Sequence, residues 1–215
     1  MTHVLWDWNG TLLDDTQAAL DTLNSMLARR GGRPITMEFY RDHFAFPVKP
    51  FYKSIGVCLE NEDWDALARE YHDVYAGRPK RLNPETPAAL ERVKASGARQ
   101  SIISALRQDL LEEITDRLGV AKYMDRICGV DNLDGFGKID RAREMLSSLR
   151  DSSGRDSSFV LIGDSLHDKE VADALGVACV LCGQGSHASW RLRAVAPTGD
   201  TLLDALELAL GGRGR

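Results

Sequence analysis

Apolar residues form two kinds of pattern along the chain. Short, continuous apolar runs occur at residues 4–6, 101–103, 159–162 and 178–181. Such runs are typical of strands covered on both faces, as in a parallel sheet. Between them, apolar residues recur at helical spacing, over residues 110–118, 142–149 and 202–210. This alternation of strands and helices predicts an α/β fold with a doubly wound parallel sheet.

One long segment, residues 14–81, shows helical patterns and no convincing strand. A helix over residues 20–27 is ended by Gly31, Gly32 and Pro34, and residues 64–75 follow the i, i+3, i+4, i+7 pattern closely. We therefore predict a helical insert at 14–81 within an α/β core formed by residues 1–13 and 82–215.

Composition excludes several classes of function. The 215 residues are 43% hydrophobic and 27% charged, with a net charge of -5. This composition is typical of soluble globular proteins and argues against binding to nucleic acid or to an anionic membrane, which needs clustered Lys and Arg. No apolar run approaches the roughly 20 residues that span a bilayer, and the N-terminus lacks a secretory signal. We expect a cytoplasmic protein, and the pattern does not indicate its oligomeric state.

The four cysteines are too few and too scattered for a disulfide framework. Cys179 and Cys182 form a C-x-x-C, but the pair lies in a predicted strand and lacks the second pair that a zinc site needs. This favours a structural role over a zinc or redox site.

Polar residues that could act in catalysis or ligand binding follow the predicted strands. Asp7 comes directly after the first strand and precedes the turn at Gly10-Thr11. Ligands of doubly wound sheets lie beyond the carboxyl ends of the strands, where a carboxylate can face them and backbone N–H groups can hold a phosphate. An Asp before a glycine turn is also a common turn residue.

Four further polar residues lie at the ends of predicted strands or helices. Asp164 and Asp168 follow the strand at 159–162, where paired carboxylates suit a hard cation or, alternatively, cap the next helix. Ser104 closes the strand at 101–103, and its hydroxyl can bind a phosphate oxygen. Lys138 precedes a helix and can place a point charge on a phosphate. Taken singly, each has a more common structural or surface role.

Taken together and in this order, these elements resemble the four motifs of the haloacid dehalogenase superfamily. Those motifs are a strand ending in Asp-x-Asp-Gly-Thr, a strand ending in Ser or Thr, a Lys before a helix, and Gly-Asp-Ser/Thr-x-x-Asp after a strand. The helical segment 14–81 resembles the cap of the phosphoglycolate-phosphatase-like branch, and the resemblance extends over residues 1–210. It implies a Rossmann-like core with an α-helical cap that closes over the site.

The resemblance also implies a function. The implied function is that of a Mg²⁺-dependent phosphatase that acts through an aspartyl-phosphate on a small phosphorylated metabolite, such as a phosphoglycolate-like acid or a sugar phosphate. The implied catalytic residues are Asp7, Asn9, Ser104 and Lys138. The implied substrate-binding residues are Gly10, Thr11, Ser104, Ala105 and Lys138. The implied metal ligands are Asp7, the backbone carbonyl of Asn9, Asp164 and Asp168.

Asn9 departs from the family pattern, which usually has an Asp that protonates the leaving oxygen and later activates water. An amide cannot exchange a proton in this way, although its backbone carbonyl is unchanged. The sequence therefore predicts a slow phosphatase, a substitute base, or a leaving group that needs little protonation. His43, His72 and His167 are the candidate substitutes.

Two other readings stay open. The superfamily includes phosphonate hydrolases that use a cap lysine and lack the second motif Asp, and Lys49 and Lys53 lie in the predicted cap. A catalytically weak module that binds a phosphorylated ligand would also fit Asn9. The acids Asp164 and Asp168 argue against the metal-free dehalogenases.

Overall fold

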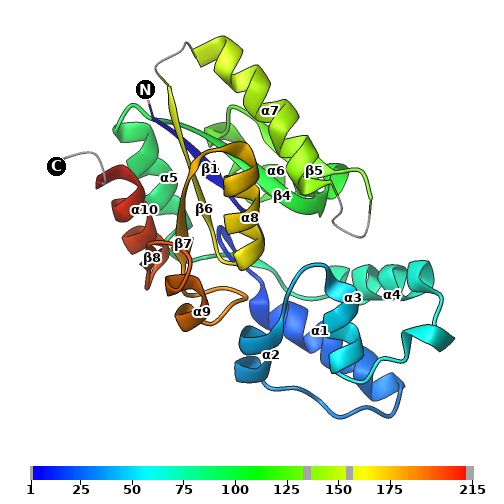
Figure 1. Cartoon of the computed structure of the whole chain (residues 1–215). Helices are drawn as coiled ribbons and strands as arrows, with labels where there is room; N and C mark the ends of the chain where they lie inside the picture. Colours follow the sequence, from blue (N-terminus) through cyan, green and yellow to red (C-terminus); the bar gives the residue numbers. More distant parts are fainter. Residues whose placement is uncertain (1, 133–136, 154–156, 212–215) are drawn as a thin grey trace.

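The computed structural model describes residues 2–132, 137–153 and 157–211. Its main sheet has six strands in the order β5-β4-β1-β6-β7-β8, and all neighbouring strands run parallel (Figure 1). The strands are β1 (Thr2–Trp6), β4 (Arg99–Arg107), β5 (Ile127–Val130), β6 (Ser158–Gly163), β7 (Ala178–Cys182) and β8 (Thr198–Gly199). The predicted doubly wound α/β fold is confirmed. Because the strand order reverses between β1 and β6, ligands are expected at their carboxyl ends.

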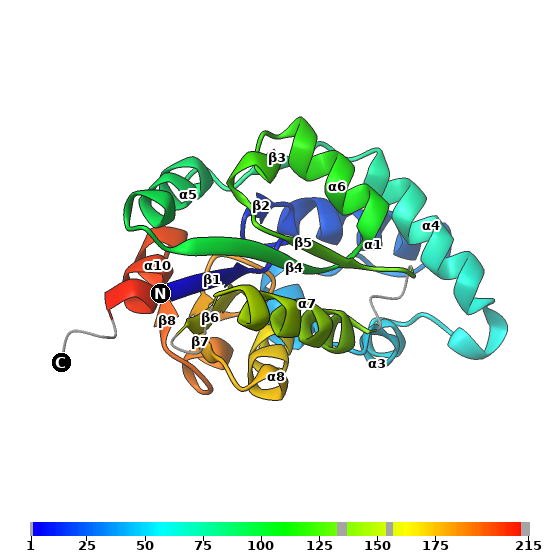
Figure 2. The ribbon, with the colours of Figure 1, turned by 90° about the horizontal axis from the view of Figure 1, so that it is seen from above.

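Helices cover both faces of this sheet. The helices α5 (Thr86–Ala95), α6 (Gln108–Arg117) and α10 (Leu202–Gly211) pack on one face, and α7 (Lys138–Ser153) and α8 (Leu166–Leu175) on the other (Figure 2). Along β1, Val4 and Trp6 pack toward the first group and Leu5 toward the second. Burial on both faces explains why the strands are continuous apolar runs. The short helix α9 (Ser189–Arg193) and the 3₁₀ turn η2 (Ala121–Tyr123) lie in the connections.

Helices between β1 and β4 form a second apolar cluster. They are α1 (Thr16–Arg29), α2 (Met37–His43), α3 (Val48–Ser54) and α4 (Trp64–Ala76), with a 3₁₀ turn η1 (Leu59–Asn61). The expectation of no strand in this part was incomplete at its ends. There β2 (Leu13–Asp14) and β3 (Arg81–Leu82) pair antiparallel, so the chain leaves and re-enters the core side by side. We call the segment 14–81 the cap. That it is a separate domain with these bounds stays a prediction.

Two details of the strands differ from the sequence expectation. β4 continues past Ser104 to Arg107, with a register shift against β5 between Ile103 and Arg107. β5 itself was not expected, because Gly129 interrupts its apolar run. A Cβ at this position would overlap Leu106 O, so the close approach of β4 requires the glycine.

The structure also bears on the C-x-x-C pair and on the expected lack of a membrane-spanning segment. Cys179 and Cys182 lie within β7, as the strand pattern predicts. In the part of the chain that the structure describes, no helix has both the length and the apolar character needed to cross a membrane.

The buried side chain of His3 on β1 makes the stability of this core depend on pH. Its side chain is buried, its Nε2 lies 2.9 Å from Ser101 Oγ, and its ring stacks on Phe159. Burial lowers the pKa of His3 to about 4, with Asp125 opposing and Arg99 adding to this shift. In the unfolded chain the pKa of His is about 6.5, so between these values the unfolded state binds more protons. Stability is therefore lost as the pH falls from about 6.5 to about 4.

We expect the His3→Gln variant to show a flatter dependence of unfolding free energy on pH. Between pH 7 and pH 5 the natural chain should lose roughly 2 kcal/mol through this one group. Urea unfolding at both pH values measures the difference. The matched control is His43→Gln, because His43 is exposed. Parallel pH profiles for the two variants would contradict the role of His3.

Candidate active site

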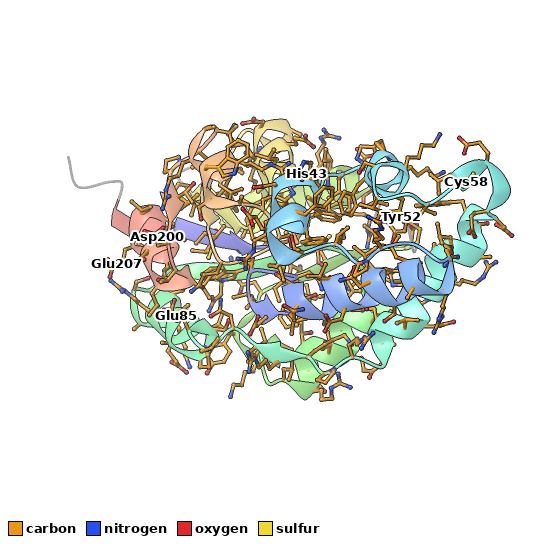
Figure 3. All side chains as sticks on the ribbon, turned by 90° about the horizontal axis from the view of Figure 1, so that it is seen from below. His43, Tyr52, Cys58, Glu85, Asp200 and Glu207 are labelled. Carbon is orange, nitrogen blue, oxygen red and sulfur yellow. The ribbon has the colours of Figure 1, made fainter. Side chains whose placement is uncertain are left out.

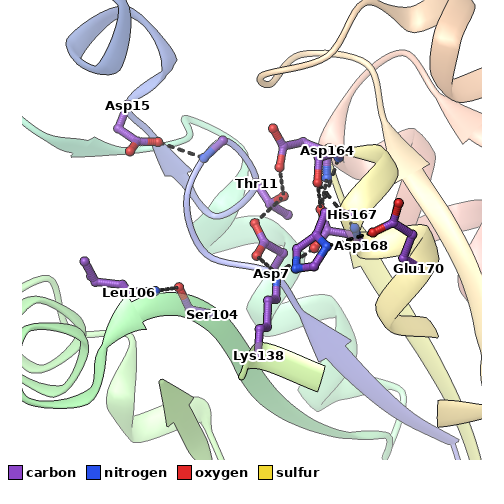
Figure 4. A network of polar contacts seen from close by, with 12 residues as sticks. Asp7, Thr11, Asp15, Ser104, Leu106, Lys138, Asp164, His167, Asp168 and Glu170 are labelled. Atoms are coloured by element: carbon purple, nitrogen blue, oxygen red, sulfur yellow. Dashed lines mark hydrogen bonds and ion pairs between the residues drawn. The ribbon is translucent and has the colours of Figure 1, made fainter. Parts of the chain in front are cut away.

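The carboxyl ends of β1 and β6 bring Asp7 and Asp164 together. The backbone N–H of Asp7 donates to Ile162 O at 2.8 Å, which continues the pairing of the two strands beyond Trp6. Thr11 Oγ1 lies 3.4 Å from Asp7 Oδ2 and 3.3 Å from Asp164 Oδ1 (Figure 4). With Asp168 on the first turn of α8, the three buried side chains offer carboxylate oxygens within 4.8 Å of one another.

Lys138, the first residue of α7, lies between two of these carboxylates. Its Nζ donates to Asp7 Oδ1 at 2.6 Å and to Asp168 Oδ1 at 2.7 Å, and all three side chains are buried. Burial alone would lower the pKa of Lys138, but the carboxylates of Asp168 and Asp7 raise it above its ordinary value. Lys138 is therefore an ammonium ion, far from the solvated surface lysine that its sequence position alone suggests.

Asp168 combines the two roles that the sequence left as alternatives. Its Oδ2 accepts from Ser165 N at 3.1 Å while its own N–H donates to Ser165 Oγ at 3.3 Å, which forms a capping box at the start of α8. Ser165 Oγ also donates to Asp168 Oδ2 at 2.7 Å. Asp168 Oδ1 pairs with Lys138. Burial alone would raise the pKa of Asp168, but Lys138 and Ser165 bring it below its ordinary value. The carboxylate is thus charged and held at both oxygens.

Glycines allow the backbone to approach these carboxylates closely. Gly10 has φ +77°, and a Cβ there would overlap the carboxylate of Asp164. Its amide donates to Asp15 Oδ1 at 2.7 Å, and the amide of Thr11 donates to Trp8 O at 3.3 Å. The two amides that were expected to hold a phosphate thus have partners within the turn. Their role in substrate binding stays a prediction.

A cavity of about 190 Å³ extends from the carboxylates into the cap. Ala105 and Leu106 line it beside Lys138, whereas Ser104 is buried and, among the described residues, not part of the wall. Ser104 Oγ accepts from Leu106 N at 3.0 Å, which leaves its O–H available to donate (Figure 4).

The candidate substitute bases and cap lysines are placed differently from one another. His72 and His167 line the cavity. His43 is exposed, with Nδ1 2.9 Å from Phe39 O. Lys53 pairs with Glu60 at 2.9 Å, and Lys49 Nζ lies 4.5 Å from the ring centre of Trp64. Of the described residues, His43, Lys49 and Lys53 are not among those that line this cavity.

The cap is held down on the core beside the site. Arg41 of α2 donates to Gly185 O at 3.0 Å and to Gln184 O at 2.8 Å. From the core side, Arg191 donates to Arg41 O at 2.8 Å and to Phe44 O at 2.9 Å. These contacts join the cap to the core loop at residues 184–185.

The cluster fits a divalent cation. Burial, followed by the charge of Asp168, raises the pKa of Asp7 well above its ordinary value and that of Asp164 to about 7. One ammonium group cannot neutralise three buried carboxylates, and uncompensated buried charge is costly. Carboxylate oxygens are also the ligands that hard cations prefer. The donor set and its excess negative charge therefore both match a cation with two positive charges.

Asn9 is held by residues at the base of the cap. Its Nδ2 donates to Asp15 Oδ2 at 2.7 Å and lies 3.1 Å from the hydroxyl of Tyr75, which itself donates to Asp15 Oδ2. Burial raises the pKa of Asp15, and the hydrogen bonds from Tyr75, Asn9 and Gly10 oppose the shift. The side chains of Asn9, Asp15 and Tyr75 all line the cavity.

Comparison with known proteins places the chain in a family. Residues 4–182 match the model of a haloacid dehalogenase-like hydrolase. The chain belongs to the haloacid dehalogenase-like hydrolases. This confirms the predicted family and the predicted class of enzyme, a hydrolase.

Individual relatives agree with this assignment. A phosphoglycolate phosphatase of Aquifex aeolicus is 26% identical, over 84% of this chain and 84% of its own length. A 5'-nucleotidase of Pseudomonas aeruginosa is 28% identical, over 91% and 89%. The crystal structure of a predicted phosphatase from Clostridium acetobutylicum superimposes with a TM-score of 0.77 at 19% identity and covers 98% of both chains. This structural likeness shows the fold.

In this haloacid dehalogenase-like hydrolase, Asp15 is the site residue that sequence reasoning missed. Asp15 follows Asp14, and two adjacent acidic residues at the end of a strand are typical of the protein surface. Asp14 is indeed part-exposed and pairs with Arg81 at 2.9 Å, whereas Asp15 turns inward. Its partner Tyr75 lies 60 residues away in the sequence, so no local signal connects them.

This pairing predicts that Asn9→Asp alone is destabilising. The new carboxylate would face Asp15 Oδ2 where an amide now donates, so a half-buried and a buried carboxylate would share one site. We expect a loss of roughly 1–3 kcal/mol at pH 7. The pair's raised pKa makes the loss grow as the pH rises above about 4.

The matched variant exchanges the two groups, as Asn9→Asp with Asp15→Asn. It restores one amide facing one carboxylate and should keep most of the natural stability. Denaturant unfolding of both single variants and the double variant at pH 5 and pH 8 completes the cycle. Additive effects of the two single changes in the double variant would show that residues 9 and 15 do not interact.

Proposed function

We propose that this chain is a Mg²⁺-dependent phosphatase that hydrolyses a small phosphorylated metabolite with Asp7 as the nucleophile. The observation that carries the proposal is the place of Asp7, paired with Lys138 in an acidic cluster that lines the cavity between core and cap. Relatives with phosphatase and nucleotidase names support phosphate-ester chemistry. The cytoplasmic location stays a prediction, and the oligomeric state stays open.

The two oxygens of Asp7 have different surroundings. Oδ1 is held by Lys138, whereas the hydrogen bond of Oδ2 within the described part of the chain is the long contact to Thr11. Oδ2 is therefore the oxygen that attacks phosphorus, forming an aspartyl-phosphate as the bond to the leaving oxygen breaks. Water then attacks the phosphorus and releases the carboxylate of Asp7 and inorganic phosphate. Lys138 orients Asp7 in both steps, and with Ser104 it binds the phosphoryl oxygens.

The metal ligands proposed are Asp7, the backbone carbonyl of Asn9, Asp164 and Asp168. Bound there, Mg²⁺ supplies positive charge that offsets the repulsion between the Asp7 carboxylate and an anionic phosphate. Because both oxygens of Asp168 already have protein partners, we assign it contact with the metal through a water molecule.

The amide of Asn9 cannot donate a proton to the leaving oxygen. His72 and His167 line the cavity and are the remaining candidates for a substitute base. A phosphonate hydrolase would need a cap lysine at the site, and no contact of Lys49 or Lys53 favours that alternative.

We expect Asp7→Asn to lower turnover by at least roughly 10³-fold, because an amide is a poor nucleophile. Its fold should persist, since Lys138 keeps its partner Asp168. Phosphate release from a panel of phosphate esters measures activity, and near-ultraviolet circular dichroism checks the fold. Asp116→Asn, an exposed position on α6, is the control. Near-natural activity of Asp7→Asn would remove Asp7 from its role.

Removal of divalent cations by a chelator should abolish turnover, and added Mg²⁺ should restore it. Asp164→Asn should raise the Mg²⁺ concentration needed for half activation, since a neutral amide binds Mg²⁺ more weakly than a carboxylate does. Calorimetric titration with Mg²⁺ provides a readout without substrate. Full activity in excess chelator would overturn the metal assignment.

A further inference from the structure

Aromatic side chains of the cap form a large part of the cavity wall. They come from α2, α3, α4 and the loop after α2, namely Tyr40, Phe44, Phe46, Tyr52, Trp64, Tyr71 and Tyr75. The rings support one another, with Tyr71 stacked on Tyr75 and Tyr52 edge-on to Trp64. Figure 3 shows Tyr52 pointing into the interior of the cap, whereas Cys58 lies at its outer end.

Positive charge is scarce in this wall. Of the described residues that line the cavity, only Lys138 is a Lys or Arg, and it is paired with Asp7 and Asp168. Two arginines of the cap have other partners: Arg41 contacts core carbonyls, and Arg30 pairs with Glu62 and Glu70. A carboxylate or second phosphate on the substrate would thus be buried among rings without a cation, which is costly.

The size of the cavity limits the substrate further. Its volume of about 190 Å³ is below the roughly 300–1,000 Å³ typical of sites for drug-sized ligands. A phosphoryl group and one small ring or short chain are what such a volume admits.

The identity of residue 9 independently limits the leaving group of the substrate. Without a general acid at residue 9, a leaving oxygen departs most easily when its anion is stable. A phenol such as the tyrosine side chain has a pKa of about 10, whereas an aliphatic hydroxyl is closer to water, about 15.7. A phenolate therefore leaves without the proton that Asn9 cannot supply.

We propose that the substrate is the phosphate monoester of a small, uncharged phenol, an inference that rests on the proposed phosphatase function. Asp7 Oδ2 forms the bond to phosphorus, the bond between phosphorus and the phenolic oxygen breaks, and the phenolate leaves with the electron pair. It takes its proton from solvent after release. The aromatic wall holds the ring, and the absence of a cap cation in that wall disfavours phosphoglycolate-like acids.

Three substrates separate recognition of the ring from stability of the leaving group. Phenyl phosphate has both, benzyl phosphate has the ring with an aliphatic leaving oxygen, and phosphoglycolate has neither. With Mg²⁺ present, we expect kcat/KM to fall in that order, with phenyl phosphate ahead of benzyl phosphate by at least roughly tenfold. Equal or faster turnover of phosphoglycolate relative to phenyl phosphate would overturn the proposal.

An engineered cation tests the charge argument. Ala68 of α4 lines the cavity, and Ala66 on the same helix is exposed. Ala68→Arg should shift the ratio of kcat/KM toward phosphoglycolate by at least roughly tenfold, and Ala66→Arg should leave the ratio unchanged. An unchanged ratio in a folded Ala68→Arg protein would contradict the charge argument.

Binding without turnover distinguishes a failure of this inference from a failure of the proposed function. Calorimetry with Mg²⁺ compares phenylphosphonate with phosphonoacetate, neither of which has an ester bond to break. Tighter binding of phenylphosphonate in a protein that hydrolyses no ester would reject the phosphatase function and keep the ligand class. Tighter binding of phosphonoacetate would reject the ligand class whatever the turnover.

Discussion

The site depends on charge compensation among side chains that are almost fully buried. Asp7, Asp164 and Asp168 are buried together, and such a cluster is stable only where positive charge is supplied. Lys138 supplies part of it and, by pairing with two of the three carboxylates, also fixes their orientation. The remaining negative charge creates the demand for a divalent cation, and it leaves one oxygen of Asp7 for an incoming phosphoryl group. Structure and proposed chemistry thus follow from one electrostatic constraint.

The same constraint connects the core to the cap. Ser186 N donates to Asp164 Oδ2 at 2.5 Å, and the preceding carbonyls of Gln184 and Gly185 accept from Arg41 of the cap. One loop therefore holds a carboxylate of the proposed metal site and the closed position of the cap. A cap that opened would release the contacts of this loop, so closure and the geometry of Asp164 are physically linked.

The sequence predicted those features whose residues are adjacent in the chain. The carboxyl ends of β1 and β6 could be placed because apolar runs and the residues after them are adjacent in sequence. Ser104 was placed at a strand end, but the register shift against β5 carries β4 beyond it. The network of Asp15 with Tyr75 joins residues 60 positions apart and could not be predicted. The aromatic wall was equally hidden, because helix residues such as Tyr71 follow the spacing of an ordinary core-facing helix.

The most direct test of the account is to trap the phosphorylated enzyme. Acid quenching of the Mg²⁺-loaded protein with phenyl phosphate, followed by borohydride reduction, converts a phosphorylated aspartate to homoserine, which peptide mass spectrometry locates. The account predicts homoserine at position 7 and at no other aspartate, with none in the Asp7→Asn protein. Turnover with no reduction at residue 7, or with phosphate attached to another side chain, would contradict it.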